Sequence, residues 1–108
     1  MDNTVAKTIL EQLGGAKFQA MTGAYSFSAG PTSLGFRISQ RNKGRYAGVR
    51  IELTPADVYD MHFIRSRMVK GHLKIEDVTR EGVYCDSLVE VFERETGLFC
   101  SLGTMGRS

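Results

Sequence analysis

Apolar and polar residues alternate with a period of two through three stretches of the first half of the chain. These stretches are Tyr25–Ala29, Leu34–Ile38 and Ala47–Leu53, separated by a turn at Gly30–Ser33 and a polar loop at Gln40–Gly44. Such alternation is typical of antiparallel strands that pack one face on a core and turn the other to water. The pattern therefore predicts an antiparallel β-meander whose apolar face needs a cover.

Two other segments carry the spacing of amphipathic helices. From about Asn3 to Leu13 the apolar residues recur on one face, and the double glycine Gly14-Gly15 follows. Near the other end, Ser87–Glu90 reads as a capping box, and Gly97 suits the end of the helix. The expected buried stripes are Ala6, Ile9, Leu10 and Leu13 in the first helix and Leu88, Val91 and Phe92 in the last. We expect an α+β fold with both helices packed on one face of the sheet.

The segments between these elements give weaker signals. We expect a further strand from Lys17 to Thr22, a helix start at Thr54–Asp57 with Pro55 in the first helical position, and a turn at Thr79–Gly82. β-like composition also predicts a hairpin, whose two strands and connecting turn are Phe63–Val69, Leu73–Val78 and Lys70–Gly71.

Size and composition fit one globular unit. The chain has 108 residues, 42% hydrophobic and 24% charged, so we expect a single domain over residues 1–102 and a loose tail over 103–108. No apolar run approaches the roughly 20 residues that cross a bilayer, and the first residues lack the pattern of a secretion signal. We therefore expect a cytoplasmic protein in which Cys85 and Cys100 are free thiols.

Charge is distributed unevenly despite a formal net charge of +2. One run without acidic residues contains Arg37, Arg41, Lys43, Arg45 and Arg50, and a second contains Arg65, Arg67, Lys70 and Lys74. The segment around the last helix instead carries Asp86, Glu90, Glu93 and Glu95 against Arg94. This layout predicts a molecule with a basic and an acidic pole.

The first basic run gives the candidate binding site. By strand parity, Arg37 and Arg50 share the solvent-facing side of the meander with Tyr46, so this face could contact phosphates and stack on a base. The candidate nucleic-acid-binding residues are Arg37, Arg41, Lys43, Arg45, Tyr46 and Arg50. The competing interpretation is that these are solubilising charges, because the sequence contains no RRM, KH or helix-turn-helix motif.

The sequence contains no catalytic, metal-binding or cofactor-binding signature. His62 follows Asp57 and Asp60 without a nucleophile at a telling spacing, the cysteines have no CxxC spacing, and the glycines form no phosphate-binding loop. We therefore expect a protein that is not an enzyme and has no cofactor. The residues that could overturn this by converging in the fold are His62 with Asp57 or Asp60, and Cys85 at a helix start.

Four segments spread over the chain resemble segments of the proteins of one family. They are LEQLGGAKFQAMTGA at Leu10–Ala24, LTPADVYD at Leu53–Asp60, EGVY at Glu81–Tyr84 and FERETGL at Phe92–Leu98. This wording resembles that of small, uncharacterised proteins of phages, prophages and related mobile elements. The family has no established activity or binding residues to carry over.

The resemblance implies a mobile-element setting, where small single-domain proteins are more often binders than enzymes. The expected function is a non-enzymatic nucleic-acid accessory protein. The alternative is an inhibitor of host defence, similar to anti-CRISPR proteins, or another module that binds a host or phage protein. A DNA mimic would need a dense acidic surface, which this chain lacks. A membrane partner is not expected, and homo-oligomerisation stays open.

Overall fold

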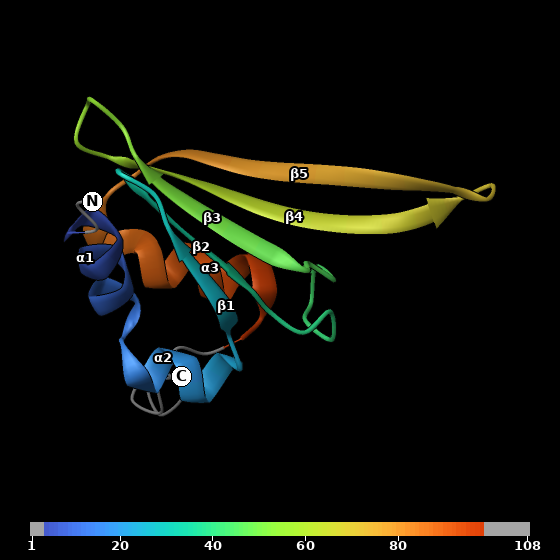
Figure 1. The fold of residues 1–108 in the computed structure, drawn as a ribbon, viewed down its shortest axis with the longest axis horizontal. Helices are drawn as coiled ribbons and strands as arrows, with labels where there is room; N and C mark the ends of the chain where they lie inside the picture. The colour runs from blue at the N-terminus through green and yellow to red at the C-terminus, as the bar shows by residue number, and fades with distance from the viewer. Residues whose placement is uncertain (1–3, 99–108) are drawn as a thin grey trace.

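The computed structural model describes residues 4–98 and shows an antiparallel sheet with helices at both ends of the chain (Figure 1). Its elements are α1 (Thr4–Leu13), α2 (Ala16–Thr22), β1 (Tyr25–Ala29), β2 (Ser33–Arg37), β3 (Gly48–Leu53), β4 (Tyr59–Val69), β5 (His72–Val83), a 3-10 turn (Cys85–Ser87) and α3 (Leu88–Thr96). The five strands lie in chain order and each is antiparallel to the next. The predicted α+β meander is confirmed. The predicted tail, 103–108, lies outside the described residues.

The core lies between the helices and one face of the sheet. Ile9 and Leu13 of α1, Phe18 of α2 and Phe92 of α3 are fully buried. The ring of Phe18 lies 5.2 Å from that of Phe36 on β2 and 5.3 Å from that of Phe92, in edge-to-face contacts that favour aromatic packing. The helices therefore cover the same sheet face, and the other face is open to solvent (Figure 1).

The segment Lys17–Thr22, expected to be a strand, belongs to helix α2. Phe18 and Thr22, four residues apart, are its buried positions, which is helical spacing rather than the period of two. The Thr22 hydroxyl donates to the Phe18 carbonyl at 2.7 Å. Gly23 then ends the helix in the left-handed conformation, with φ 72°. Burial of one large aromatic residue, Phe18, outweighs the local strand signal.

Two other local predictions are also wrong. Thr54–Asp57 starts no helix: the Thr54 N–H and hydroxyl both donate to the Val58 carbonyl, at 2.8 and 3.0 Å, and close a turn between β3 and β4. Thr79–Gly82 is part of β5, which continues to Val83. A bulge there shifts the register between β4 and β5, and Gly82 accommodates it with φ 68°.

The predicted hairpin is confirmed and its strands are longer than expected. Lys70 and Gly71 connect β4 to β5 with φ angles of 52° and 83°, the positive pair that a two-residue mirror-image turn requires. Strand β3 pairs with β4 only as far as Ile64. The part of the hairpin beyond it, Arg65–Glu76, is called here the projecting ribbon and extends from the body of the molecule (Figure 1).

Helix α3 confirms the last predicted helix but not its capping box. The Ser87 side chain makes no capping hydrogen bond, because the 3-10 turn Cys85–Ser87 leads directly into the helix. Leu88, Phe92 and Thr96 are the buried positions of α3, and Val91 is half-buried. Gly97 ends the helix in the left-handed conformation, as predicted.

Candidate nucleic-acid interface

Asn42 holds the long loop between β2 and β3 in one shape. Its side-chain amide donates to the carbonyls of Ser39 and Tyr46, both at 2.7 Å, and its oxygen accepts from the Tyr46 N–H at 2.8 Å. Asn42 is itself buried. Because buried amides and carbonyls are costly to leave unpaired, these three bonds fix the positions of the neighbouring loop residues.

Tyr46 is buried, so the expectation that it faces solvent beside Arg37 and Arg50 is wrong. It lies before β3 begins at Gly48, and strand parity does not apply to it. The residue is 4% exposed, and its ring packs 5.4 Å from the ring of Phe63, with the Arg65 guanidinium 5.4 Å from its centre. Burial raises the pKa of Tyr46, and the nearby Glu95 carboxylate raises it further. Tyr46 supports the loop and offers no surface for a base.

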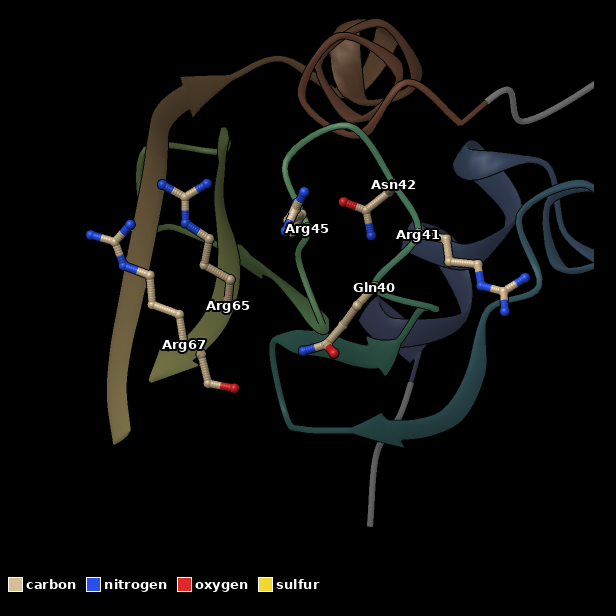
Figure 2. Close-up of a pocket in the computed structure, with 7 residues that line it drawn as sticks. Gln40, Arg41, Asn42, Arg45, Arg65 and Arg67 are labelled. Atoms are coloured by element: carbon tan, nitrogen blue, oxygen red, sulfur yellow. The ribbon is translucent and has the colours of Figure 1, made fainter. Parts of the chain in front are cut away.

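The two basic runs of the sequence meet at one hollow, called here the arginine hollow. It has a volume of about 780 Å³ and lies between the β2–β3 loop and strand β4 (Figure 2). Its lining residues are Gln40, Arg41, Asn42, Arg45, Arg65, Ser66 and Arg67. In Figure 2 the side chains of Arg65 and Arg67 lie beside each other on β4, and Arg45 comes from the facing loop. Arg41 contributes at the rim, its side chain directed away from β4.

The four arginines of the hollow differ in how firmly they are held. The Arg65 guanidinium donates to the Glu76 carboxylate at 2.9 Å and to the Gly44 carbonyl at 3.0 Å. The bond to Glu76 lowers the pKa of that carboxylate. Arg67 lies 3.4 Å from the same carboxylate and stays mostly exposed. Within residues 4–98, Arg41 and Arg45 take part in no ion pair. The hollow therefore combines one fixed guanidinium, that of Arg65, with two exposed ones, those of Arg45 and Arg67, that can meet an anion, and Arg41 lies at its rim.

A second hollow of about 390 Å³ adjoins the first through a shared residue, Gln40. Tyr25 and Arg37 line it, and these two residues are register partners across β1 and β2. Tyr25 is 51% exposed, although its parity with Phe27 predicted an inward side chain. Ser26, with φ 54°, sits in a register irregularity of β1 that turns Tyr25 outward. The alternating sequence gave no signal of this bulge.

Lys43 and Arg50 line neither hollow. The Lys43 N–H donates to the Thr96 carbonyl at 2.8 Å, and its ammonium lies 3.4 Å from the Arg94 carbonyl. It thus satisfies carbonyls at the end of α3, where a cation is favoured. Arg50 lies on the open face of the sheet, 3.1 Å from Glu52. Of the candidate residues, the structure brings together Arg41 and Arg45 and places Arg37 next to them.

His62 has a carboxylate and a hydroxyl beside it, but not those the sequence suggested. Its Nδ1 lies 3.3 Å from Asp77 and 3.2 Å from Thr79, because strand register places Thr79 opposite it. The expected partners, Asp57 and Asp60, lie elsewhere: Asp60 accepts from the Gly82 N–H at 3.3 Å. Neither hollow described above is lined by His62. The prediction that the protein is not an enzyme stays a prediction.

Cys85 is exposed and lies in the 3-10 turn before α3. The other cysteine predicted to be a free thiol, Cys100, lies outside the described residues. Across residues 4–98, no group of three or more His, Cys, Asp or Glu side chains could hold a metal ion. None of the helices in this range has the length and apolar composition to span a membrane.

Comparison of the chain with protein-family models, curated proteins and solved structures gave no match. The fold and the site describe a small α+β protein with a five-stranded meander and an arginine-lined hollow at the end of the sheet where the β2–β3 loop meets β4.

Proposed function

We propose that this protein binds single-stranded nucleic acid without catalysing a reaction. The observation that carries the proposal is the convergence of Arg45, Arg65 and Arg67, from two separate basic runs, on one hollow that has Arg41 at its rim. The carboxylate paired with these arginines is Glu76, which contacts Arg65 and Arg67. An excess of guanidinium groups in a concave site favours a phosphate backbone, because each neutralised phosphate releases counterions.

The state of each arginine supports this assignment. Arg45 and Arg67 can contact phosphate oxygens without breaking a buried bond, since both are exposed. Arg65 is held by Glu76 and the Gly44 carbonyl, so its charge is fixed in place before a ligand arrives. Guanidinium groups bind phosphate through paired N–H donors, which adds geometric specificity to charge attraction.

The second hollow favours a single strand over a duplex. Tyr25 presents a half-exposed aromatic ring beside Arg37, and Gln40 links this hollow to the arginine hollow. An aromatic platform next to a basic groove is the combination with which proteins bind unpaired bases. We infer that phosphates occupy the arginine hollow and that one base stacks on Tyr25.

The resemblance to phage and prophage proteins supports a role as an accessory protein of a mobile element in the host cytoplasm. The alternative function is an inhibitor of host defence that binds a protein. A pull-down from host lysate distinguishes it from a nucleic-acid-binding function. Capture of one protein complex that survives nuclease treatment, together with no affinity of the pure protein for nucleic acid, would favour the alternative.

The direct test is a fluorescence anisotropy titration with labelled single-stranded and duplex DNA of one sequence, each at two salt concentrations. We expect tighter binding to the single strand and weaker binding at the higher salt concentration. Tyr25→Ala should weaken single-strand binding by about 1–3 kcal/mol, the usual contribution of one stacked base, whereas Tyr25→Phe should retain it. Absence of binding at low salt would refute the proposal.

A further inference from the structure

Strand β4 has an unpaired edge inside the arginine hollow. One of its edges pairs with β5 as far as Val69, but β3 follows the other edge only to Ile64. Beyond Ile64 the chain of β3 has turned away into the β2–β3 loop, and no other strand of residues 4–98 replaces it. Ser66 lies in this section and lines the hollow. The directions of its backbone N–H and carbonyl decide what this edge can bind.

The hairpin turn determines which residues of β4 bond to β5. In an antiparallel pair, residues that exchange backbone hydrogen bonds with the facing strand alternate with residues whose N–H and carbonyl point away from it. The two-residue turn at Lys70–Gly71 makes Val69 and His72 an exchanging pair. Ser66 lies three residues before Val69, and the register is regular between them. Its N–H and carbonyl therefore point away from β5.

The end of β3 indicates the same direction. The Ile64 carbonyl accepts from the Ala47 N–H at 2.8 Å, so the backbone groups of Ile64 face β3. Ser66 follows two residues later, and its groups face the same side, where the β2–β3 loop and the hollow lie. Among residues 4–98, no group of the loop bonds to the Ser66 N–H or to its carbonyl. Ser66 thus presents a free donor beside a free acceptor to the hollow.

We propose that this edge binds the Watson–Crick edge of one unpaired nucleic-acid base. Each base carries a hydrogen-bond donor beside an acceptor there, so it can bond to the Ser66 carbonyl and N–H as a neighbouring strand would. In a duplex the opposite base occupies those groups, and only a single strand presents them. The inference rests on the proposed function and deepens it, because it assigns a base contact in addition to stacking on Tyr25.

The surroundings of Ser66 favour a nucleotide over an extended peptide, which can also pair with a strand edge. Arg45 comes from the facing loop, and Arg65 and Arg67 flank Ser66 in the chain (Figure 2). A nucleic-acid strand places a phosphate at every nucleotide, whereas a peptide meets these cations only where it carries an acidic side chain. The hollow, at about 780 Å³, lies in the size range of pockets that enclose whole organic ligands, so it has room for a base and its phosphate.

A thermodynamic cycle that changes the ligand and the protein in turn tests the proposal. The ligands are single-stranded oligothymidylate and the same oligomer built from N3-methylthymine, which keeps the phosphates and the stacking ring but loses the N3–H donor. The proteins are the wild type and Ser66→Pro, in which proline removes an N–H that makes no bond to β5. We expect methylation to weaken wild-type binding about fivefold or more, the value of one neutral hydrogen bond. Ser66→Pro should bind both oligomers alike, because its edge no longer holds the base.

Met68→Pro is the matched control. The Met68 N–H faces the same edge two residues further out, and neither hollow described above is lined by Met68. Both substitutions adjoin Arg67, so a disturbance of that arginine would appear in both variants. The control should keep the wild-type affinity for oligothymidylate and the wild-type preference for it over the methylated oligomer.

Equal affinity of the wild type for the two oligomers, or a preference that persists in Ser66→Pro, overturns this inference and leaves the proposed function standing. Absence of binding to either oligomer at low salt refutes the proposed function and this inference together. If Ser66→Pro fails to fold by circular dichroism, the wild-type amide resonances decide: the Ser66 signal should shift further with oligothymidylate than with the methylated oligomer, and the Met68 signal should not distinguish them. A Ser66 shift produced by oligoglutamate but not by oligothymidylate assigns the edge to an acidic peptide and refutes base binding.

Discussion

At the scale of single residues, the β2–β3 loop depends on a position without a side chain. The ring of Tyr46 occupies the space that a Cβ on Gly44 would need, and the Gly44 carbonyl accepts a bond from Arg65. A methyl group at Gly44 would have to displace the Tyr46 ring, which packs on Phe63 while Asn42 holds the Tyr46 backbone. One glycine thus links loop shape to the position of an arginine in the hollow.

We predict that Gly44→Ala lowers the free energy of unfolding by about 1–3 kcal/mol, the usual cost of overpacking a filled site. Gly48→Ala is the matched control, because its Cβ would meet the Phe36 carbonyl at 3.5 Å, an ordinary contact. Urea denaturation should show a loss in the first variant and no loss in the second. Equal stability of the two variants would contradict this account of the loop.

The buried Tyr46 hydroxyl also makes stability depend on pH in the alkaline range. Its pKa is raised, first by burial and then by Glu95, so the folded state keeps the proton at pH values where the unfolded chain loses it. Its contribution is fully present below about pH 10, where an unfolded tyrosine ionises, and is lost as pH rises through the folded pKa. Burial raises the pKa of Tyr59 in the same direction.

We therefore predict that Tyr46→Phe reduces, without abolishing, the loss of stability above about pH 10, since Tyr59 still contributes. Unfolding free energies from urea denaturation at neutral and alkaline pH check this, with tyrosinate absorbance as an independent readout. An alkaline loss of unchanged size in the variant would show that Tyr46 is not the group responsible.

At the scale of elements, the projecting ribbon should unfold as a unit separate from the body of the sheet. Beyond Ile64 the ribbon lacks a neighbour strand within the described chain, so its backbone bonds depend on the turn at Lys70–Gly71. Gly71 has φ 83°, which a β-branched residue adopts only under strain. The turn is thus the point at which the ribbon can be weakened alone.

Gly71→Val is expected to destabilise the ribbon by about 1–2 kcal/mol, the cost of a left-handed conformation for a residue with a side chain. Amide hydrogen exchange should speed up at Val69 and His72 and stay unchanged in β3. Lys74→Val, at an extended position of the same ribbon, is the control and should leave the exchange rates near wild type. Faster exchange throughout β3 in the Gly71 variant would mean that ribbon and body unfold together.

The local sequence pattern correctly predicted the elements in which buried residues recur with a single regular spacing, every second residue in a strand or every third to fourth in a helix. Leu34, Phe36 and Ile38 are buried as their alternation indicated, and the first and last helices end at their glycines. The pattern failed where distant packing decides: Phe18 makes α2 helical, the bulge at Ser26 turns Tyr25 outward, and Tyr46 folds inward under Arg65. These outcomes depend on residues far along the chain.

Only part of the candidate site could be predicted from the sequence. Both basic runs are visible in the sequence, and Arg41 and Arg45 were among the candidate residues. Their meeting with Arg65 and Arg67 depends on how the β2–β3 loop lies against β4, which no short pattern encodes. Lys43 contacts the carbonyls at the end of α3 instead of lining the hollow, and this too follows from a contact between distant segments.

At the scale of the whole molecule, charge is less divided into poles than the sequence indicated. Glu95 of α3 pairs with Arg80 of β5 at 3.0 Å, and Glu90 pairs with Arg94 at 2.7 Å. Part of the acidic helix is therefore neutralised within the fold. The arginine hollow keeps an excess of cations, so it is the part of the surface where an anionic partner gains most.

The most direct test of this account is the salt dependence of single-strand binding in matched charge variants. Arg45→Gln/Arg67→Gln removes two charges from the hollow, and Lys7→Gln/Arg94→Gln removes two from helices α1 and α3. If both hollow arginines contact phosphates, the first variant should lower the slope of log K against log salt by about 1.4, since each contact to a single strand contributes about 0.7. The second variant should keep the wild-type slope. Equal slopes in the wild type and the hollow variant, or equal losses in both variants, would contradict binding in the arginine hollow.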